Sequence, residues 1–300
     1  MKSLLSICDI KDEITEILDL ANEFKQGLIK GKPLDRKTLA MIFQKSSTRT
    51  RVSFEVGMYE LGGHGLFLSD NDLQMGRGEP ISDTAKVLSR YVDGIMIRAI
   101  EHKDLVEFEK TATVPIISGL SNLEHPCQAL ADMQTIKEYK GDFNGKFVYV
   151  GDGNNVCNSL LLICACLGMD IMAACPKGYE PNEEVIEKAK SIAKESNSYV
   201  TITDDVEIAV KDADVVYTDV WVSMGDENQQ EKRRNDLEKY QVNSKLMKLA
   251  RGNAIFMHCL PAVRGEEVTA EVIDGENSVV IDQAENRLHA QKAILYHLLK

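Results

Sequence analysis

The sequence predicts an α/β protein built from two doubly wound domains, each with a parallel sheet. Strand-like apolar runs alternate with helical patterns along the chain, which is typical of parallel sheets covered by helices. Of the 300 residues 44% are hydrophobic, enough for two cores in domains of about 150 residues each. Polar motifs follow several strands, and such sheets bind ligands beyond the carboxyl ends of their strands. We therefore expect one site, in the cleft between the two domains.

The first series of elements fills the N-terminal part of the chain. A helix is expected from about Ile10, with Asp9 as its cap, to Lys30, where Gly31 ends it. The predicted strands are Thr38–Phe43, Gly65–Leu68, Gly94–Arg98 and Val114–Ser118, and the helical patterns between them include Val52 to Tyr59 and Ile81–Tyr91.

The second series follows after residue 145. Its predicted strands are Lys146–Gly151, Asp170–Ala174, Val200–Thr203, Val215–Val220, Ala254–His258 and Val279–Ile281, with helices at Asn155–Leu167 and Glu183–Glu195. A helix at Cys127–Tyr139 is expected to join the domains, and an amphipathic helix from about Ala284 to Leu299 to pack back on the first. The expected division is therefore 1–135, 136–283 and a returning helix at 284–300.

Composition excludes several classes of function. The net charge of −12 argues against binding to nucleic acid or to an anionic membrane. Asp9, Asp12 and Glu13 precede any apolar core of a signal peptide, and the longest apolar run, Leu160 to Met169, is too short to cross a bilayer. The seven cysteines are scattered, with no zinc-type spacing. They indicate reduced thiols in the cytoplasm, and we expect no metal site.

The run Ser46-Ser47-Thr48-Arg49-Thr50-Arg51 lies between a buried strand and the start of a helix. Hydroxyls, two guanidiniums and the N–H groups of the first helical turn gather there, and the helix dipole adds positive potential. Arginine offers a bidentate fork that matches phosphate. A serine cap with surface arginines is the structural alternative, but the density of donors favours a site for a dianion.

His125-Pro126-Cys127-Gln128 opens the predicted joining helix, and proline suits the first turn. His125 and Gln128 lie about one turn apart, so both can reach one carbonyl group. A neutral imidazole N–H or a glutamine amide can polarise a carbonyl oxygen and stabilise an oxyanion. Taken alone, the motif is equally typical of a helix cap beside a buried glutamine.

Gly151-Asp152-Gly153-Asn154-Asn155 also joins a strand to a helix, the usual place of a dinucleotide fingerprint. Position 156 is valine where that fingerprint has its third glycine, and the next strand ends in Ala-Cys-Pro without an acidic residue for a ribose. We therefore expect no nicotinamide cofactor, and interpret Asn155 as an amide facing the cleft.

Two further motifs follow strands. Asp219, at the start of Asp-Val-Trp-Val-Ser-Met-Gly, can hold an ammonium group, with Ser223 adding a hydroxyl and Gly225 serving as a hinge. His258-Cys259-Leu260-Pro261 places a histidine beside a thiol. Neighbours on a strand point to opposite faces, so His258 is a poor base for Cys259, which we interpret as a binding group. Arg98 and Arg287 are further candidate anion ligands, and Gln74 lies in a polar loop.

Together these motifs resemble the ornithine carbamoyltransferases, within the aspartate/ornithine carbamoyltransferase family, over nearly the whole chain. The resemblance rests on Ser47–Thr50, on His-Pro-Cys-Gln at 125–128, on the segment from Asp219 to Ser-Met-Gly and on His-Cys-Leu-Pro at 258–261. The first two are shared across the family, whereas the last two resemble the ornithine branch.

The resemblance implies roles for named residues. Those that would bind carbamoyl phosphate are Ser47, Thr48, Arg49, Thr50, Arg98, His125, Pro126, Cys127, Gln128, Cys259, Leu260 and Arg287, with Gln74 reaching in from a neighbouring subunit. Those that would bind L-ornithine are Asn155, Asp219, Ser223 and Met224. Within this set the reaction would depend on Arg49, Arg98, His125, Gln128 and Cys259. The resemblance also implies a homotrimer or a multiple of trimers, and no cofactor.

The implied reaction joins carbamoyl phosphate to the δ-amine of ornithine, giving citrulline and phosphate, a step of arginine metabolism. Two enzymatic rivals are carbamoyltransferases for putrescine or aspartate. Putrescine has no α-amino acid head for Asp219, Asn155 and Ser223 to bind, and aspartate calls for a cationic specificity loop. A non-catalytic relative would have lost the arginine cluster or the His125/Gln128 pair, and both are intact.

Overall fold

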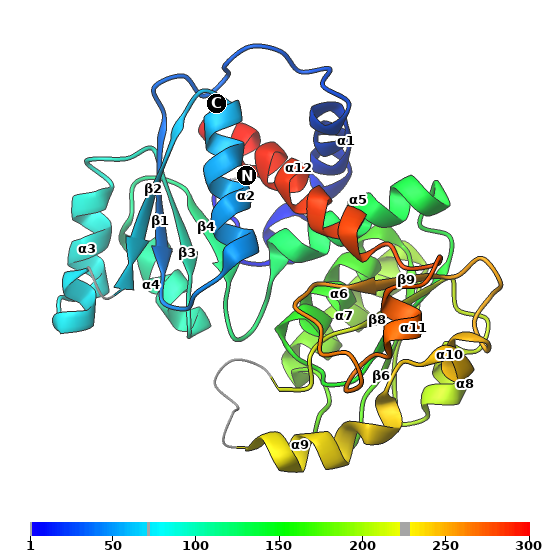
Figure 1. The fold of residues 1–300 in the computed structure, drawn as a ribbon. Helices are drawn as coiled ribbons and strands as arrows, with labels where there is room; N and C mark the ends of the chain where they lie inside the picture. Colours follow the sequence, from blue (N-terminus) through cyan, green and yellow to red (C-terminus); the bar gives the residue numbers. More distant parts are fainter. Residues whose placement is uncertain (1, 71–72, 223–228) are drawn as a thin grey trace. The chain divides into compact units, whose positions relative to one another are not determined.

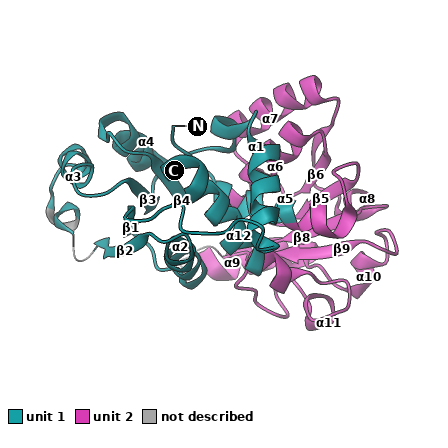
Figure 2. Ribbon diagram, turned by 90° about the horizontal axis from the view of Figure 1, so that it is seen from above, with its two compact units in different colours: residues 1–134, 285–300 teal, residues 135–284 magenta. Residues whose placement is uncertain are grey.

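The computed structural model describes residues 2–70, 73–222 and 229–300. The chain divides into two compact units, residues 1–134 with 285–300 and residues 135–284, coloured separately in Figure 2. Each unit contains one parallel sheet, so the α/β class and the two-domain organisation are confirmed.

Unit 1 has a four-stranded sheet in the order β2-β1-β3-β4 (Figure 1). Its strands are β1 (Thr38–Phe43), β2 (His64–Ser69), β3 (Gly94–Arg98) and β4 (Ile116–Leu120). Its helices are η1 (Ile7–Ile10), α1 (Ile14–Lys25), α2 (Thr48–Glu60), η3 (Gln74–Arg77), α3 (Ile81–Leu88) and α4 (His102–Thr111), where η marks a 3₁₀ helix. The helix α5 (Pro126–Lys140) begins in unit 1 and ends in unit 2, and α12 (Val280–Leu299) begins in unit 2 and ends in unit 1.

Alternating residues of β1 explain why helices cover both faces of this sheet. Ala40 and Ile42 lie in a core cluster with Leu105 and Phe108 of α4. Leu39 points to the other face, where Gly94 lets Leu299 of α12 approach. Successive side chains of a strand point to opposite faces, so a run that is apolar throughout is buried on both. Five of the six residues of β1, all but Thr38, are buried, and the strand is central in the sheet.

Unit 2 has a five-stranded sheet in the order β7-β6-β5-β8-β9. Its strands are β5 (Lys146–Val150), β6 (Asp170–Ala174), β7 (Val200–Thr203), β8 (Val215–Thr218) and β9 (Ile255–His258). Its helices are α6 (Asn155–Leu167), α7 (Glu183–Ser196), α8 (Val206–Val210), α9 (Gln230–Leu237), η5 (Glu238–Tyr240), α10 (Ser244–Met247) and α11 (Ala270–Ile273). Val148 and Val150 of β5 and Val216 of β8 pack against α8, α10 and α11 in one core cluster.

Two sequence predictions about elements were wrong. The expected first helix is split, because the Asp9 carboxylate accepts hydrogen bonds from Leu5 N and Ser6 N and so stabilises the separate turn η1. Helix α1 then ends at Lys25, since Gly27 takes a left-handed conformation before Gly31 is reached. The run 279–281 is not a strand. Ser278 makes a single bridge to Phe256, and α12 begins at Val280.

Candidate active site

Strand order reverses once in each sheet. In unit 1 this happens at β1, which has β2 on one side and β3 on the other, and in unit 2 at β5, between β6 and β8. Loops leaving the two strands diverge at such a point and leave room for a ligand beyond the carboxyl ends. Ser47–Thr50 follow β1 and Arg98 ends β3, whereas Asn155 follows β5 and Asp219 follows β8. The predicted site residues therefore form two half-sites, one per unit.

The first half-site is built on the start of α2. Ser47 caps this helix, with its Oγ accepting from Thr50 N at 3.3 Å. Thr48 is exposed, Arg49 half-buried and Thr50 buried. Within the described parts of the chain the Arg49 guanidinium makes no hydrogen bond or ion pair. The first turn of α2 therefore offers a cation and N–H groups together, which is the arrangement that binds phosphate.

Arg287 of α12 is held against this turn by two side chains of unit 1. Its Nη1 donates to Gln128 Oε1 at 2.6 Å and its Nη2 to Thr50 Oγ1 at 3.2 Å. All three side chains are buried. Residues 237 positions apart in the chain thus share one polar cluster, and a guanidinium with little freedom remains oriented for a ligand.

His125 lies in the same positive environment. Its pKa is lowered well below 6.5, mainly by burial and further by the charges of Arg287, Arg98 and Arg49. An imidazole in such surroundings is neutral at physiological pH, so one ring nitrogen carries a proton and can donate to a carbonyl oxygen. Arginines from β3, α2 and α12 therefore act on one histidine.

The other residues predicted for carbamoyl phosphate differ in placement. Pro126 is the first residue of α5, and the buried thiol of Cys127 donates to Ser118 O in β4. Any part Cys127 plays in binding therefore falls to its backbone. Gln74 is exposed in η3. Leu260 belongs to unit 2, where it packs against the core and has a left-handed backbone.

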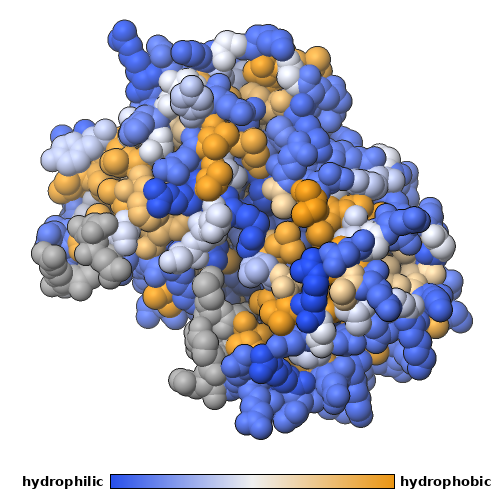
Figure 3. All heavy atoms as spheres, in the orientation of Figure 1, coloured by the Kyte–Doolittle hydropathy of each residue, from blue (hydrophilic) through white to orange (hydrophobic). Residues whose placement is uncertain are grey.

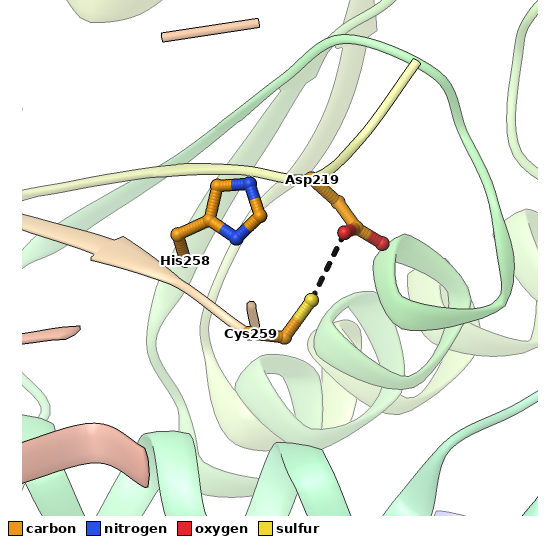
Figure 4. Close-up of side chains that lie close together, drawn as sticks. All are labelled: Asp219, His258 and Cys259. Atoms are coloured by element: carbon orange, nitrogen blue, oxygen red, sulfur yellow. Dashed lines mark hydrogen bonds between the residues drawn. The ribbon is translucent and has the colours of Figure 1, made fainter. Parts of the chain in front are cut away.

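The second half-site centres on the Asp219 carboxylate (Figure 4). Its Oδ1 accepts from Cys259 Sγ at 3.0 Å and from Val220 N at 2.8 Å, and its Oδ2 accepts from Asn154 Nδ2 at 2.7 Å. Asn154 also caps α6, since its Oδ1 accepts from Val156 N and Cys157 N. The carboxylate is thus fixed by donors from β5, β8 and β9 loops, and its charge suits an ammonium group.

His258 serves the turn after β9. Its Nδ1 accepts from Leu260 N at 2.8 Å, so the proton lies on Nε2, which donates to Glu267 Oε1 at 3.1 Å. Cys259 comes after the last residue of β9, so the expectation that the two side chains face opposite sides of a strand rested on a wrong premise. Their donor atoms lie within 4.8 Å of each other. His258 is nevertheless occupied at both nitrogens and is unsuited to activating the thiol.

The hydrogen bonds at both ring nitrogens of His258 also decide whether this group of residues can bind a metal ion. Asp219, His258 and Cys259 bring three donor atoms together. A metal ion needs a lone pair on an imidazole nitrogen. The Nδ1 lone pair is used by Leu260 N and Nε2 bears the proton donated to Glu267. This trio therefore does not fit a metal without breaking the turn.

An ion pair between α9 and the segment after β5 supports this half-site. Arg233 of α9 donates through Nη1 to Asp152 Oδ2 at 2.8 Å and to Trp221 O at 3.1 Å. It ties α9 to the segments that follow β5 and β8. Of the predicted ornithine ligands, Asn155 is half-buried at the start of α6, while Ser223 and Met224 lie outside the described residues.

Sequence reasoning missed the residues that support the site. Asn154, Asp152 and Arg233 were not singled out, although Asn154 stands at a recognisable cap position. Asp132 was also missed. It follows Gln128 by four residues, a spacing that puts two helical side chains on one face, and its Oδ1 accepts from Gln128 Nε2 at 2.8 Å.

Among the described residues, no helix is both long and apolar enough to cross a membrane. Residues 2–138 match the carbamoyl-P binding domain of the aspartate/ornithine carbamoyltransferases, and residues 144–298 match the Asp/Orn binding domain of the same family.

Full-length relatives agree with these matches. The chain is 67% identical over 301 residues to an ornithine carbamoyltransferase of Methanobrevibacter smithii, with 100% of both chains covered. It is 64% identical to one of Methanothermobacter thermautotrophicus, covering 100% of this chain and 99% of the relative. The solved ornithine carbamoyltransferase from Pyrococcus furiosus superposes with a TM-score of 0.96 at 56% identity, over 99% of this chain and 97% of that one. Both domain matches and these relatives agree with the two half-sites that lie where strand order reverses. The chain belongs to the aspartate/ornithine carbamoyltransferase family.

Proposed function

We propose that this chain transfers the carbamoyl group from carbamoyl phosphate to the δ-amine of L-ornithine, giving L-citrulline and phosphate. The observation that carries the proposal is the buried His125 of unit 1, on which the charges of Arg49, Arg98 and Arg287 act. Three guanidiniums match the dianionic phosphate, and a neutral imidazole N–H matches the carbonyl oxygen that gains charge during attack. The relatives that share the whole length of the chain carry the name of this activity.

Ornithine is the amine that best fits the half-site of unit 2. Asp219 is an oriented carboxylate, which attracts the α-ammonium group of an amino acid. Putrescine keeps this ammonium group and lacks only the α-carboxylate, so Asp219 does not by itself separate the two amines, whereas aspartate would bring further negative charge to it. The attacking δ-amine is then left to point toward the carbamoyl carbon.

The chemistry requires no covalent intermediate on the protein. The δ-amine forms a bond to the carbamoyl carbon, the tetrahedral intermediate loses phosphate as the C–O bond breaks, and the amine proton passes to a phosphate oxygen. Both substrates must be held together in attack geometry, which is worth about 7–11 kcal/mol. The two half-sites must therefore act on one reacting pair, and we propose that they face a common cleft during turnover.

The amine must attack in its uncharged form, although a free alkylamine has a pKa of about 10.4. Positive charges near an amine lower its pKa, as does removal from water. The arginines that bind phosphate in unit 1 supply that charge, so one cluster serves both substrates. Cys259 is proposed as a contact for the substrates, consistent with a thiol that donates to Asp219.

An assay of citrulline formation with ornithine, putrescine and aspartate side by side tests this function. We expect ornithine to be preferred by kcat/KM by about two orders of magnitude or more, the size expected when a buried charge pair is lost. Equal or better turnover of putrescine would assign the chain to another amine. Absence of turnover with all three would favour a ligand-binding relative.

We further propose a homotrimer or a multiple of trimers that works in the cytoplasm in arginine metabolism. The strand β2 is an edge strand with an exposed Leu66, and Figure 3 shows apolar surface where Figure 1 places β2. An exposed strand edge presents unpaired backbone groups that can pair with another chain. Gln74, exposed soon after this edge, is the residue proposed to complete a neighbour's site. The seven free thiols fit a reducing compartment.

Mixing inactive variants tests the shared site. Chains with Arg49→Ala and chains with Gln74→Ala should regain activity when unfolded and refolded together, because some hybrid sites then contain both native residues. Neither variant should gain activity when it is refolded alone. A fully active monomer in sedimentation would refute the shared site.

A further inference from the structure

Asp132 lies in α5, one turn after Gln128, and its side chain is fully buried. Its Oδ1 accepts a hydrogen bond from Gln128 Nε2 at 2.8 Å. Burying an ionised carboxylate is costly unless charge and hydrogen bonds compensate it. The hydrogen bond from the buried Gln128 is one such compensation, so the acid constrains the orientation of the glutamine amide.

A glutamine amide has two different ends, a donor NH₂ and an acceptor oxygen. Asp132 accepts from the NH₂ end, and on the other side Arg287 Nη1 donates to Oε1 at 2.6 Å. Turning the amide over would put oxygen against carboxylate and NH₂ against guanidinium, two contacts between groups of the same kind. The acid and the guanidinium therefore select one orientation together.

This orientation decides what Gln128 can recognise. Sequence reasoning offered its NH₂ to the carbonyl oxygen of the substrate, but this end of the amide donates one of its two N–H groups to Asp132, and the opposite end lies beside Arg287. The oxygen lies on the side of Arg287 and Thr50, and a carbonyl oxygen has a second lone pair to accept with. An acceptor at that place selects a ligand group that donates, such as the –NH₂ of a carbamoyl group.

We propose that Asp132 is a positioning residue that locks the Gln128 amide with its oxygen toward the substrate, and so makes the site prefer a carbamoyl phosphate to other acyl phosphates. The inference rests on the proposed function, because it assumes that carbamoyl phosphate binds in unit 1. Acetyl phosphate is the matched probe. It shares the phosphoryl and carbonyl groups but has a methyl group that cannot donate.

The test compares the two ligands by equilibrium binding to the full-length protein without ornithine. Asp132→Ala should weaken carbamoyl phosphate about tenfold, the effect of one lost hydrogen bond, and acetyl phosphate less than about twofold. Asp132→Asn should recover part of the loss, since an amide oxygen can still accept from Gln128. In a Gln128→Ala background, Asp132→Ala should have no further effect on the ratio of the two affinities, because its partner is gone.

Asp93→Ala is the matched control. Asp93 accepts from Thr38 N and Lys37 at the amino end of β1, in the same unit but at the opposite edge of the sheet. The Asp93→Ala variant should be less stable than the wild type, but the ratio of its affinities for carbamoyl phosphate and acetyl phosphate should be unchanged. If Asp132→Ala weakens both ligands equally, or still changes the ratio without Gln128, the positioning role is refuted. Failure of the wild-type protein to bind carbamoyl phosphate would instead refute the proposed function.

A measurement on the wild-type chain covers the case in which Asp132→Ala does not fold. The side-chain NH₂ of Gln128, labelled with ¹⁵N and assigned with Gln128→Ala, should exchange slowly with water, before and after carbamoyl phosphate is added. Fast exchange in the free protein would show that the amide is not locked, and would overturn the proposal.

Discussion

The two half-sites use the same topology for opposite electrostatic purposes. Each lies where strand order reverses in a parallel sheet, at β1 in unit 1 and at β5 in unit 2. In unit 1 the residues at this point include arginines whose charges act on a buried histidine. In unit 2 they include an oriented carboxylate. The fold thus fixes where a ligand binds, and the few side chains after each strand fix which charge it bears.

The half-sites also differ in how their charges are compensated. The Asp219 carboxylate accepts three hydrogen bonds within its own unit. Arg49 has no partner among the described residues. A charge that is already paired gains less from a ligand than an unpaired one, because its partners must be shared. We therefore expect mutations in unit 1 to be the more damaging for activity, and the following predictions test that order.

The largest effect is expected for Arg49→Ala. Loss of a bidentate guanidinium–phosphate contact should lower kcat/KM about 10³-fold, since charge stabilisation in a closed site is lost. Circular dichroism and thermal unfolding should be unchanged, because Arg49 supports no other side chain. Arg49→Lys retains the charge without the fork and should also be poor. Near wild-type kcat/KM for the alanine variant would remove the phosphate assignment.

Asp219→Asn should have the next largest effect. Ornithine binding, measured with a carbamoyl phosphate analogue present, should weaken about 10²-fold, whereas carbamoyl phosphate should bind as before. Any binding of putrescine should weaken as well, since its second ammonium group can also pair with this carboxylate. Unchanged ornithine affinity would mean that Asp219 only supports the loop, and the contrast between the half-sites would fail.

The third prediction concerns the pH dependence of unit 1. Burial and arginine charges lower the pKa of His125 below its unfolded value of about 6.5, so the unfolded chain takes up a proton that the folded chain excludes. Stability should fall as pH drops below about 6.5, by at most about 1.4 kcal/mol per pH unit from this group.

Urea unfolding at several pH values measures this dependence. His125→Gln should make the decline shallower, while His102 and His289, whose pKa values burial also lowers, continue to contribute. Proton NMR of His125 should show no titration between pH 6.5 and 8. A titration near pH 7 would mean that the arginines do not lie close to His125, and would contradict the cationic half-site.

The smallest effect is expected for Cys259→Ser. A hydroxyl can replace the thiol as a donor to Asp219, so ornithine KM should rise about threefold with kcat largely retained. Alkylation of Cys259 should inhibit the enzyme because the added group fills the space where ornithine binds. A bound ornithine analogue should protect the thiol from alkylation. A carbamoyl-thioester trapped on Cys259, or an inactive serine variant that still binds both ligands, would instead indicate a nucleophile.

The sequence by itself determined the fold class and the position of most candidate ligands. Apolar runs such as Thr38–Phe43 predicted buried parallel strands, and eight of the predicted strands match within one residue at their starts and within two at their ends. The local motifs were recognisable because a cap, a cluster of donors or a proline acts over one helical turn. Such signals lie within a few neighbouring residues, so no tertiary contact is needed to detect them.

Tertiary structure decided what those side chains can do. The pairing of Arg287 with Thr50 joins residues 237 positions apart, and no local pattern predicts it. It also decided that Gln128 turns its oxygen toward Arg287, that His258 serves a turn, and that α12 begins at Val280, within the predicted strand. The physical reason is that buried hydrogen bonds are chosen by whichever donors and acceptors packing brings together, and that choice is made across the whole chain.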